Sequence, residues 1–378
     1  MNRLLLLAFL TVVAAPLAAQ TDQERWRDSY YPIISYSSND GVTLGFRYIL
    51  TQRASFDAPY FFKGALITDV SASASGSYGV GVRFKAPGLR HNWRFDLAGS
   101  LAKQTRYAFY GLGEHTSYHA DSVTDGQRYY YKVRRAQRQA KGEVSRRLVG
   151  RWWLTGMAQY KRTEFTDLPG PSTFTDAFPS TLTETDLLGR VGLVYDSRDN
   201  DFDTHRGLLL DAGMIHGTGE GSGYDRWVMD ARAWVPFGEW RSTWLSIRAV
   251  ASAATGDLPL DARLYLPVWE GQVRVLGGAE SHRGLLDQRY VGRDLLFGNV
   301  TLDHDLFNAG AFGAGGVSAF ADVGRVFEDD RFSLTTDGMK FGAGAGFYFR
   351  FLQTGVYTFN FAKGPDGFVF TLGNSWMF

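Results

Sequence analysis

The chain ends with Thr-Leu-Gly-Asn-Ser-Trp-Met-Phe, residues 371–378. Apolar and aromatic side chains occupy alternate positions of this ending and its approach, at Phe368, Phe370, Leu372, Trp376 and Phe378. A period of two indicates a β-strand with one apolar face. Such a strand at the edge of a sheet would aggregate in water. A closed barrel in an outer membrane has no free edge and turns this face toward lipid. The ending therefore predicts a transmembrane β-barrel.

The N-terminus predicts export through the Sec pathway to the cell outer membrane. Arg3 precedes an apolar run over residues 4–13, and small residues follow over 16–20. This order is typical of a secretory signal peptide, with cleavage expected near Ala19. The apolar run is too short for a transmembrane helix. We expect three parts: a signal peptide at 1–19, a short periplasmic segment at 20–29 and a barrel at 30–378.

Composition supports strands that are apolar on one side only. The 378 residues include 44 Gly, 28 Phe, 19 Tyr and 10 Trp, yet the mean hydropathy is only −0.20. Cysteine is absent, which excludes disulfides and thiolate metal sites. Lys and Arg number 40 against 39 Asp and Glu, so bulk charge indicates no nucleic-acid partner. We expect neither a cofactor nor a metal.

Alternation between turn residues predicts an all-β fold of sixteen antiparallel strands, the even number that a closed barrel needs. The expected strands are 30–37, 41–51, 61–72, 76–86, 92–103, 127–147, 152–165, 185–197, 207–217, 223–236, 240–253, 293–307, 313–327, 339–351, 354–362 and 368–378. Counted from a periplasmic N-terminus, every long link falls on the external side, as in outer-membrane barrels. These long links are 104–126, 166–184, 254–292 and 328–338.

The strand expected at 339–351 shows how the two faces divide. Phe341, Phe347 and Phe349 share one parity, which suits lipid. Lys340 and Arg350 share the opposite parity with three glycines, which suits a polar lumen; these glycines are Gly342, Gly344 and Gly346. Glycine allows close backbone approach. We therefore expect another segment to pack against this part of the wall.

The link 254–292 is far longer than a hairpin needs. Glycines bracket Arg283 within it, and Gly284 follows directly, so a tight turn would present a guanidinium at its tip. Asp322 lies on strand 313–327 with inward parity. We expect this sixth external loop to fold into the lumen and bring Arg283 to Asp322. Such a buried pair needs bidentate geometry to offset desolvation.

These motifs resemble the barrel domain of the BamA/TamA superfamily, which includes two-partner-secretion transporters and bacterial surface antigens. In that family the sixth external loop carries a Val-Arg-Gly-Phe/Tyr tip, and its Arg meets an acidic residue on the thirteenth strand. The tip here, His282-Arg283-Gly284-Leu285, matches the Arg and the Gly but neither flanking residue. Asp322 falls on the thirteenth expected strand, in a Phe-x-Asp-x-Gly-x-Val-Phe context.

Four more stretches resemble the family in the same order. They are 109–113, like an aromatic-Gly-Leu-Gly signature; 196–207, like the fourth periplasmic turn; 342–346, like the fourteenth strand; and 371–378, like the C-terminal signal read by the barrel-assembly machinery. In the last of these the assembly signal would be Gly373, Trp376 and Phe378. One departure is large: about ten residues separate the expected cleavage site from the first strand, where insertase members carry POTRA domains.

The resemblance implies that the protein assists insertion or translocation of proteins or other macromolecules, with unfolded outer-membrane or secreted proteins as clients. It also implies a weak seam between the first and last strands, and Pro32 in the first strand removes one ladder donor there. A passive channel or structural barrel is the alternative. An outer-membrane enzyme ranks third, because the seven histidines scatter along the chain without a recognisable triad.

Other candidates have two interpretations each. Arg134, Arg135 and Arg138 either meet lipopolysaccharide phosphates or line the lumen mouth. Aromatic residues that we expect in girdles at the two membrane interfaces are Tyr129, Tyr130, Tyr131, Trp152, Trp153 and Trp376. Glu114, His115 and His119 contain metal-binding groups, but they sit in a loop without helical spacing, so we expect no metal there.

Overall fold

The computed structural model describes residues 25–37, 39–55, 58–123, 127–219, 221–237, 242–309, 313–328, 332–351, 355–373 and 376–377. Sixteen strands among these residues form one sheet, in which sequence neighbours pair antiparallel. A separate two-stranded hairpin interrupts the series between the eleventh and twelfth sheet strands. The sheet thus has the expected strand number and chain-order topology.

The sheet strands are β1 (Trp26–Ser37), β2 (Gly41–Arg53), β3 (Phe62–Ser73), β4 (Tyr78–Arg90), β5 (Trp93–Ala108), β6 (Lys132–Val149), β7 (Trp152–Thr166), β8 (Thr181–Asp196), β9 (Gly207–Gly217), β10 (Tyr224–Phe237), β11 (Thr243–Gly256), β14 (Asp294–Asn308), β15 (Gly313–Phe327), β16 (Lys340–Phe351), β17 (Gly355–Gly364) and β18 (Gly367–Gly373). The hairpin consists of β12 (Tyr265–Val268) and β13 (Gly271–Arg274). Short helical turns are η1 (Ala120–Ser122), α2 (Thr173–Ala177) and α3 (Leu260–Leu264). In the described part of the chain, no helix has the length and apolarity to cross a membrane.

Six expected strand ends are wrong by four or five residues. β4 ends at Arg90 rather than 86, β5 ends at Ala108 rather than 103, and β8 begins at Thr181 rather than 185. The other three lie at β1, β6 and β18. β1 begins at Trp26 rather than 30, so residues 26–29 belong to the sheet and not to a preceding segment. β6 begins at Lys132 rather than 127, because a turn precedes it in which the Lys132 amide donates to the Tyr129 carbonyl. β18 ends at Gly373 rather than 378. The expected signal peptide and residues 20–24 lie outside the described residues.

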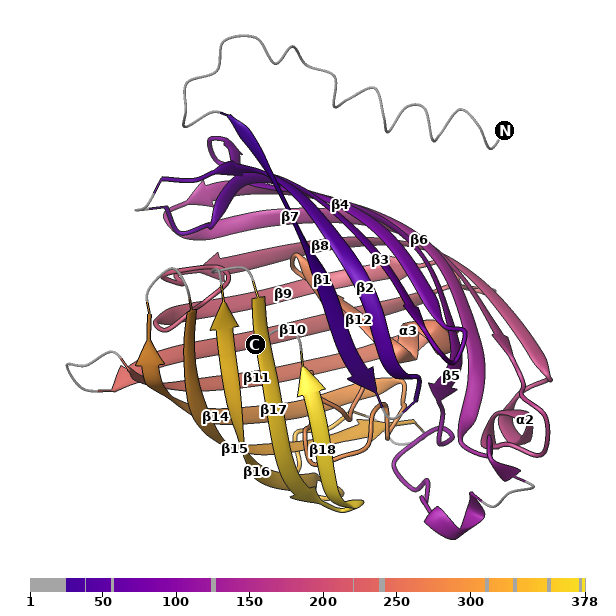
Figure 1. Cartoon of the computed structure of the whole chain (residues 1–378). Helices are drawn as coiled ribbons and strands as arrows, with labels where there is room; N and C mark the ends of the chain where they lie inside the picture. Colours follow the sequence, from indigo (N-terminus) through magenta and orange to yellow (C-terminus); the bar gives the residue numbers. More distant parts are fainter. Residues whose placement is uncertain are drawn as a thin grey trace.

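Figure 1 shows the sheet curling around a central space that holds α3 and β12. Both belong to the link between β11 and β14, residues 257–293, which we call the inner segment. At the ends of the sheet, Cα atoms of β1 and β18 approach within 8 Å. The described residues nevertheless show no ladder between these two strands.

The two faces of the sheet differ as the alternation predicts. Along β7 and β8, exposed and buried residues alternate with a period of two. On β16, Phe341 is 62% exposed whereas Tyr348 is 1% exposed. The outward face carries most of the exposed Leu, Val and Phe side chains, and the concave face carries buried charged and polar ones. The largest apolar cluster lies where the inner segment packs on the concave face.

Candidate functional site

The inner segment reverses direction sharply just before its Arg283 tip. Gly277 and Gly278 have positive φ angles of 124° and 94°, which favour glycine. Ser281 closes the turn: its Oγ accepts from the Gly277 amide at 2.9 Å and donates to the Val275 carbonyl at 2.8 Å. Ser281, His282 and Arg283 are all at most 3% exposed. The glycine-bracketed sequence therefore presents a buried guanidinium, as expected.

Arg283 contacts Asp322 of β15 in the bidentate manner that the sequence predicts. Its Nε and Nη2 donate to the two carboxylate oxygens at 2.9 and 2.7 Å, and its own amide adds a third bond at 2.8 Å. Nη2 also donates to Thr301 Oγ1 at 2.9 Å, and Asn299 Nδ2 donates to Asp322 at 2.9 Å. The guanidinium lies 3.6 Å from the Phe320 ring centroid. These partners satisfy both buried charges.

Glycines let the tip of the inner segment approach the concave face of the sheet. Only one of the three glycines that we expected in this role has it. A Cβ at Gly342 would lie 3.0 Å from Gly284 Cα and 2.7 Å from His282 Cε1. A Cβ at Gly364 would overlap the Gly284 carbonyl. Gly344 and Gly346 instead make room for β17 and for side chains of neighbouring strands. The sequence did not predict close packing at Gly364, because the Pro-Asp-Gly that follows it is typical of a hairpin turn.

Ion pairs fix the rest of the inner segment to many strands. Asp261 of α3 accepts from Arg135 of β6 at 2.5 Å and from Lys161 of β7 at 2.9 Å. Further along, Arg289 pairs with Asp366 in the β17–β18 turn at 3.0 Å. All five side chains in these pairs are at most 6% exposed. Removing one partner of such a pair leaves an uncompensated buried charge.

The β12–β13 turn forms a second ionic anchor. Glu270 occupies the turn with a positive φ of 54°, which is uncommon outside glycine. Its carboxylate pairs with Lys85 and with Arg94, each at 2.8 Å. Burial alone would raise the pKa of Glu270, but these two cations hold its pKa well below the usual range. Next to it, the Trp269 amide donates to Asp211 of β9 at 2.7 Å.

The three arginines of β6 divide between the two faces of the sheet. Arg135 points inward and lies over the Tyr107 and Tyr265 rings as well as against Asp261. Arg138 is exposed on the opposite face. The interpretation that these arginines line the interior is therefore correct for Arg135 and wrong for Arg138. Arg134 is partly buried.

The beginning of the loop that follows β5 packs on the inner segment. The Gly113 amide donates to the Val291 carbonyl at 2.7 Å, and Leu112 forms a bridge with Val291. Glu114 pairs with Arg325 of β15 at 2.7 Å, so an arginine occupies this carboxylate. Across the part of the chain that the structure describes, no group of three or more His, Asp or Glu residues could hold a metal ion.

Several aromatic residues expected in girdles lie inside instead. Tyr131 is 4% exposed and packs with Tyr110, Tyr118 and Tyr130. Trp153 lies against Arg94 on the concave side. Trp152, in contrast, is exposed on the outward face and packs edge-on against Tyr195. The parity of the strand explains the split between the two tryptophans, because neighbouring residues point to opposite faces.

The C-terminal tail also departs from the expected strand. Trp376 packs edge-on against Tyr348 and Trp244 of the concave face, with ring centroids 4.9 and 6.1 Å apart. Arg248 donates to the Met377 carbonyl at 3.1 Å. The strand alternation therefore stops at Gly373, and Trp376 is an interior residue rather than a girdle residue. Phe378 lies outside the described residues.

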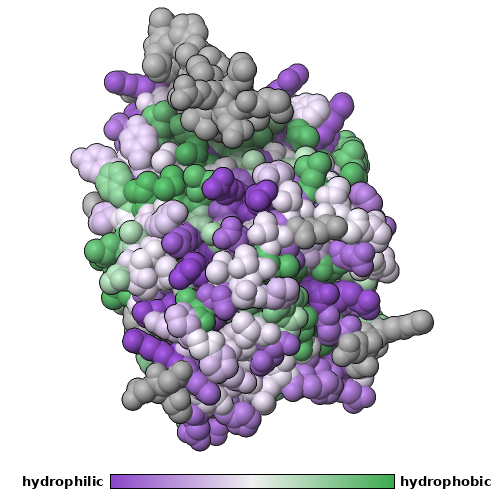
Figure 2. Space-filling view, turned by 90° about the vertical axis from the view of Figure 1, so that its right-hand side faces the viewer, coloured by the Kyte–Doolittle hydropathy of each residue, from purple (hydrophilic) through white to green (hydrophobic). Residues whose placement is uncertain are grey.

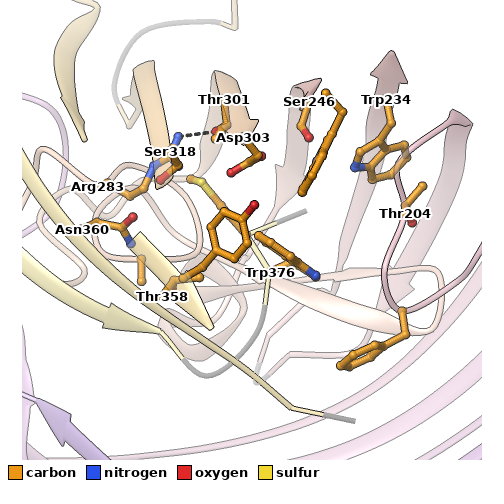
Figure 3. A pocket seen from close by; sticks show the side chains of 15 residues that line it. Thr204, Trp234, Ser246, Arg283, Thr301, Asp303, Ser318, Thr358, Asn360 and Trp376 are labelled. Atoms are coloured by element: carbon orange, nitrogen blue, oxygen red, sulfur yellow. Dashed lines mark hydrogen bonds between the residues drawn. The ribbon is translucent and has the colours of Figure 1, made fainter. Parts of the chain in front are cut away.

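A small polar cavity lies beside Arg283 (Figure 3). Its volume is about 30 Å³, and Trp376, Trp234, Ser246 and Asp303 are among the residues that line it. Asp303 is 3% exposed, and none of the described residues donates a hydrogen bond to its carboxylate. A second cavity of about 510 Å³ lies along the hairpin, and most of the side chains that line it are charged or polar. The concave space is thus filled unevenly, with room for water.

The turn between β8 and β9 closes over one side of this space. Arg350 of β16 pairs with Asp203 of the turn and with Asp305 of β14. The His205 ring packs on Trp244 at 4.1 Å between centroids. Asp196 and Arg198 of the same region pair at 2.9 Å. The Asp-rich stretch 199–203 is therefore a hydrogen-bonded turn in which Asp199 and Asn200 cap nearby amides.

Many solved structures match this chain, and two of them illustrate the shared fold. BamA from Haemophilus ducreyi lacking POTRA domains 1–3 is 13% identical, with a TM-score of 0.58 over 93% of this chain and 70% of that one. CdiB from Escherichia coli is 14% identical, with a TM-score of 0.62 over 91% of this chain and 61% of that one. No protein-family model and no curated protein sequence matches the chain. The match to two structures of this class agrees with the resemblance that the motifs indicate, and at these identities it establishes the fold alone.

Proposed function

We propose that the sheet closes into an outer-membrane barrel with the inner segment in its lumen, and that the barrel assists insertion or translocation of proteins at that membrane. The tip of the inner segment carries the proposal. Arg283 and Gly284 contact β14 to β17, the strands that lead to the end of the sheet. Because the tip contacts these strands, a movement of the inner segment would move the last strands of the sheet with it.

The ends of the sheet support a seam that opens. β18 pairs with β17 over seven residues, and the described residues show no ladder from β18 to β1. Pro32 lies within β1 and cannot donate to a partner strand. A client strand could therefore pair with either edge at little cost in existing hydrogen bonds. Unfolded outer-membrane or secreted proteins are the clients that this geometry suits.

The test is the folding rate of a second barrel into liposomes that contain the full chain. We expect faster folding than in empty liposomes. The chain has no cysteine, so one cysteine placed in β1 and one in β18 form the only possible disulfide. Oxidation should abolish the acceleration and reduction should restore it. No acceleration by the unmodified chain, even with periplasmic partners added, would refute the proposed function.

A passive channel is the second candidate. The cavity of about 510 Å³, lined by charged side chains such as Arg83, Lys85 and Asp96, favours it. A channel would conduct ions steadily in planar bilayers, without client protein, and with no acceleration of client folding. The two measurements therefore separate the candidates.

A further inference from the structure

Two arginines face each other on the outward surface of the sheet. Arg138 of β6 and Arg162 of β7 are direct cross-strand partners, and both are exposed. Neither forms a hydrogen bond or an ion pair with any described residue. Like charges directly opposite on one face of a sheet destabilise it. Glu164, the cross-strand partner of Ala136, lies one outward step beyond Arg162 on the same face, but it forms no ion pair with either arginine. An external anion would offset the repulsion between the two arginines.

The arginines lie at one edge of an apolar band. On β6, the outward residues from Arg138 to Arg146 are Ala140, Gly142 and Val144. Eight residues span about 26 Å at ~3.3 Å each, and a strand tilt near 40° reduces this to a height of roughly 20 Å. That height approaches the band of about 25 Å typical of outer-membrane barrels. Arg138 and Arg146 thus mark opposite boundaries of the band.

The neighbouring strand gives the same boundary. Outward positions of β7 run from the exposed Trp152 to the exposed Tyr160, and Arg162 follows one step beyond. Aromatic residues at both ends of an apolar band are typical of the two membrane interfaces. Arg162 therefore lies at headgroup level, just outside Tyr160. Figure 2, viewed from the right-hand side of Figure 1, shows apolar side chains most densely in the upper half and hydrophilic ones more often below.

We propose that Arg138 and Arg162 bind a phosphate group of an outer-leaflet lipid, the lipid A of lipopolysaccharide. This inference requires the outer-membrane location proposed above but not the handling of clients. Two guanidinium groups can bind a phosphate through charge-assisted, bidentate hydrogen bonds. Leu101, Tyr160 and Leu187 lie beside them on the same face, each at least 42% exposed, and offer an apolar wall for an acyl chain.

A third cation fits the same site. Lys103 of β5 is the cross-strand partner of Ala136, one outward step from Arg138 toward the loop end of the strand. It lies on the same face as the two arginines. Its flexible ammonium supplies a point charge for a second phosphate group. A ligand with two phosphates therefore suits the site better than a lipid with one.

The test compares binding of diphosphoryl lipid A, dephosphorylated lipid A and phosphatidylglycerol to the folded chain in detergent micelles, by native mass spectrometry. We expect the unmodified chain to bind diphosphoryl lipid A at least tenfold more tightly than either other lipid. Arg138→Ala combined with Arg162→Ala should lose that preference. Arg146→Ala combined with Arg151→Ala is the matched control, because both residues are exposed at the other end of the same strand pair.

The outcomes decide the proposal in either direction. Equal binding of the three lipids by the unmodified chain would overturn it, and this comparison does not depend on any variant folding. Tight binding of phosphatidylglycerol would show a general anion preference rather than a lipid A site, and would also overturn it. An equal loss in the control pair would mean that positive charge at either end of the β6–β7 pair suffices, and would overturn the proposed site. A failure to accelerate client folding leaves the expected lipid binding unchanged.

Discussion

At the scale of single residues, the Arg283–Asp322 pair is the contact whose loss should be most costly. Both side chains are at most 4% exposed, and three hydrogen bonds join the two residues. Removing one partner of a buried pair typically costs about 3–5 kcal/mol. Arg283→Ala and Asp322→Asn should each lower the free energy of unfolding by that amount. Urea unfolding in detergent micelles measures it.

A double-mutant cycle checks the physical reason for that loss. Because each single variant leaves one buried charge without its partner, the variant with both changes should be less destabilised than the sum of the two. The same cycle on His216 and Asp225, an exposed pair at 2.9 Å, is the control and should show little coupling. Additive losses for Arg283 and Asp322 would contradict the prediction.

The site could be predicted from the sequence only where a local signal exists. Glycines around Arg283, and an acidic residue of inward parity at Asp322, marked that pair. Asp261 and Glu270 carried no such signal, because the inner segment has no strand or helix period over most of its length. Their partners lie on β4 to β7, more than 90 residues away. Such pairings depend on the tertiary path of the segment, which composition and periodicity do not specify.

At the scale of elements, all sixteen sheet strands follow from alternation and turn residues. The errors lie where tertiary contacts override the pattern. Residues 127–131 include three consecutive tyrosines, which favour a strand, yet Tyr130 and Tyr131 join an aromatic cluster in a turn. Trp376 keeps the expected spacing, yet contacts with Trp244 and Tyr348 turn it inward. The alternation predicts that a strand is present, whereas tertiary packing decides at which residue the strand begins or ends.

The β12–β13 turn should make the stability of the inner segment depend on pH. Arg94 and Lys85 depress the pKa of Glu270 when the protein is folded. A depressed carboxyl pKa contributes stability above the unfolded value of about 4.3, and this contribution disappears as the pH falls through the folded value. Thermal stability should therefore fall below about pH 4. Glu270→Gln should be less stable at pH 7 and should lose less on acidification; an equal loss in both chains would contradict this.

At the scale of the whole molecule, the inner segment should decide whether the proposed barrel conducts ions. It lies in the space inside the curved sheet, where cavities of about 30 and 510 Å³ remain. Replacing residues 259–291 with a short Gly-Ser linker removes most of the inner segment and leaves the sixteen sheet strands intact. We expect planar bilayers with the full chain to show small conductance steps, and bilayers with the shortened chain to show large, steady ones. Shortening the loop at 332–337 is the control, because that loop lies between β15 and β16, outside the inner segment. Large steady steps from the full chain would mean that the inner segment leaves the pore open, and would favour the passive channel.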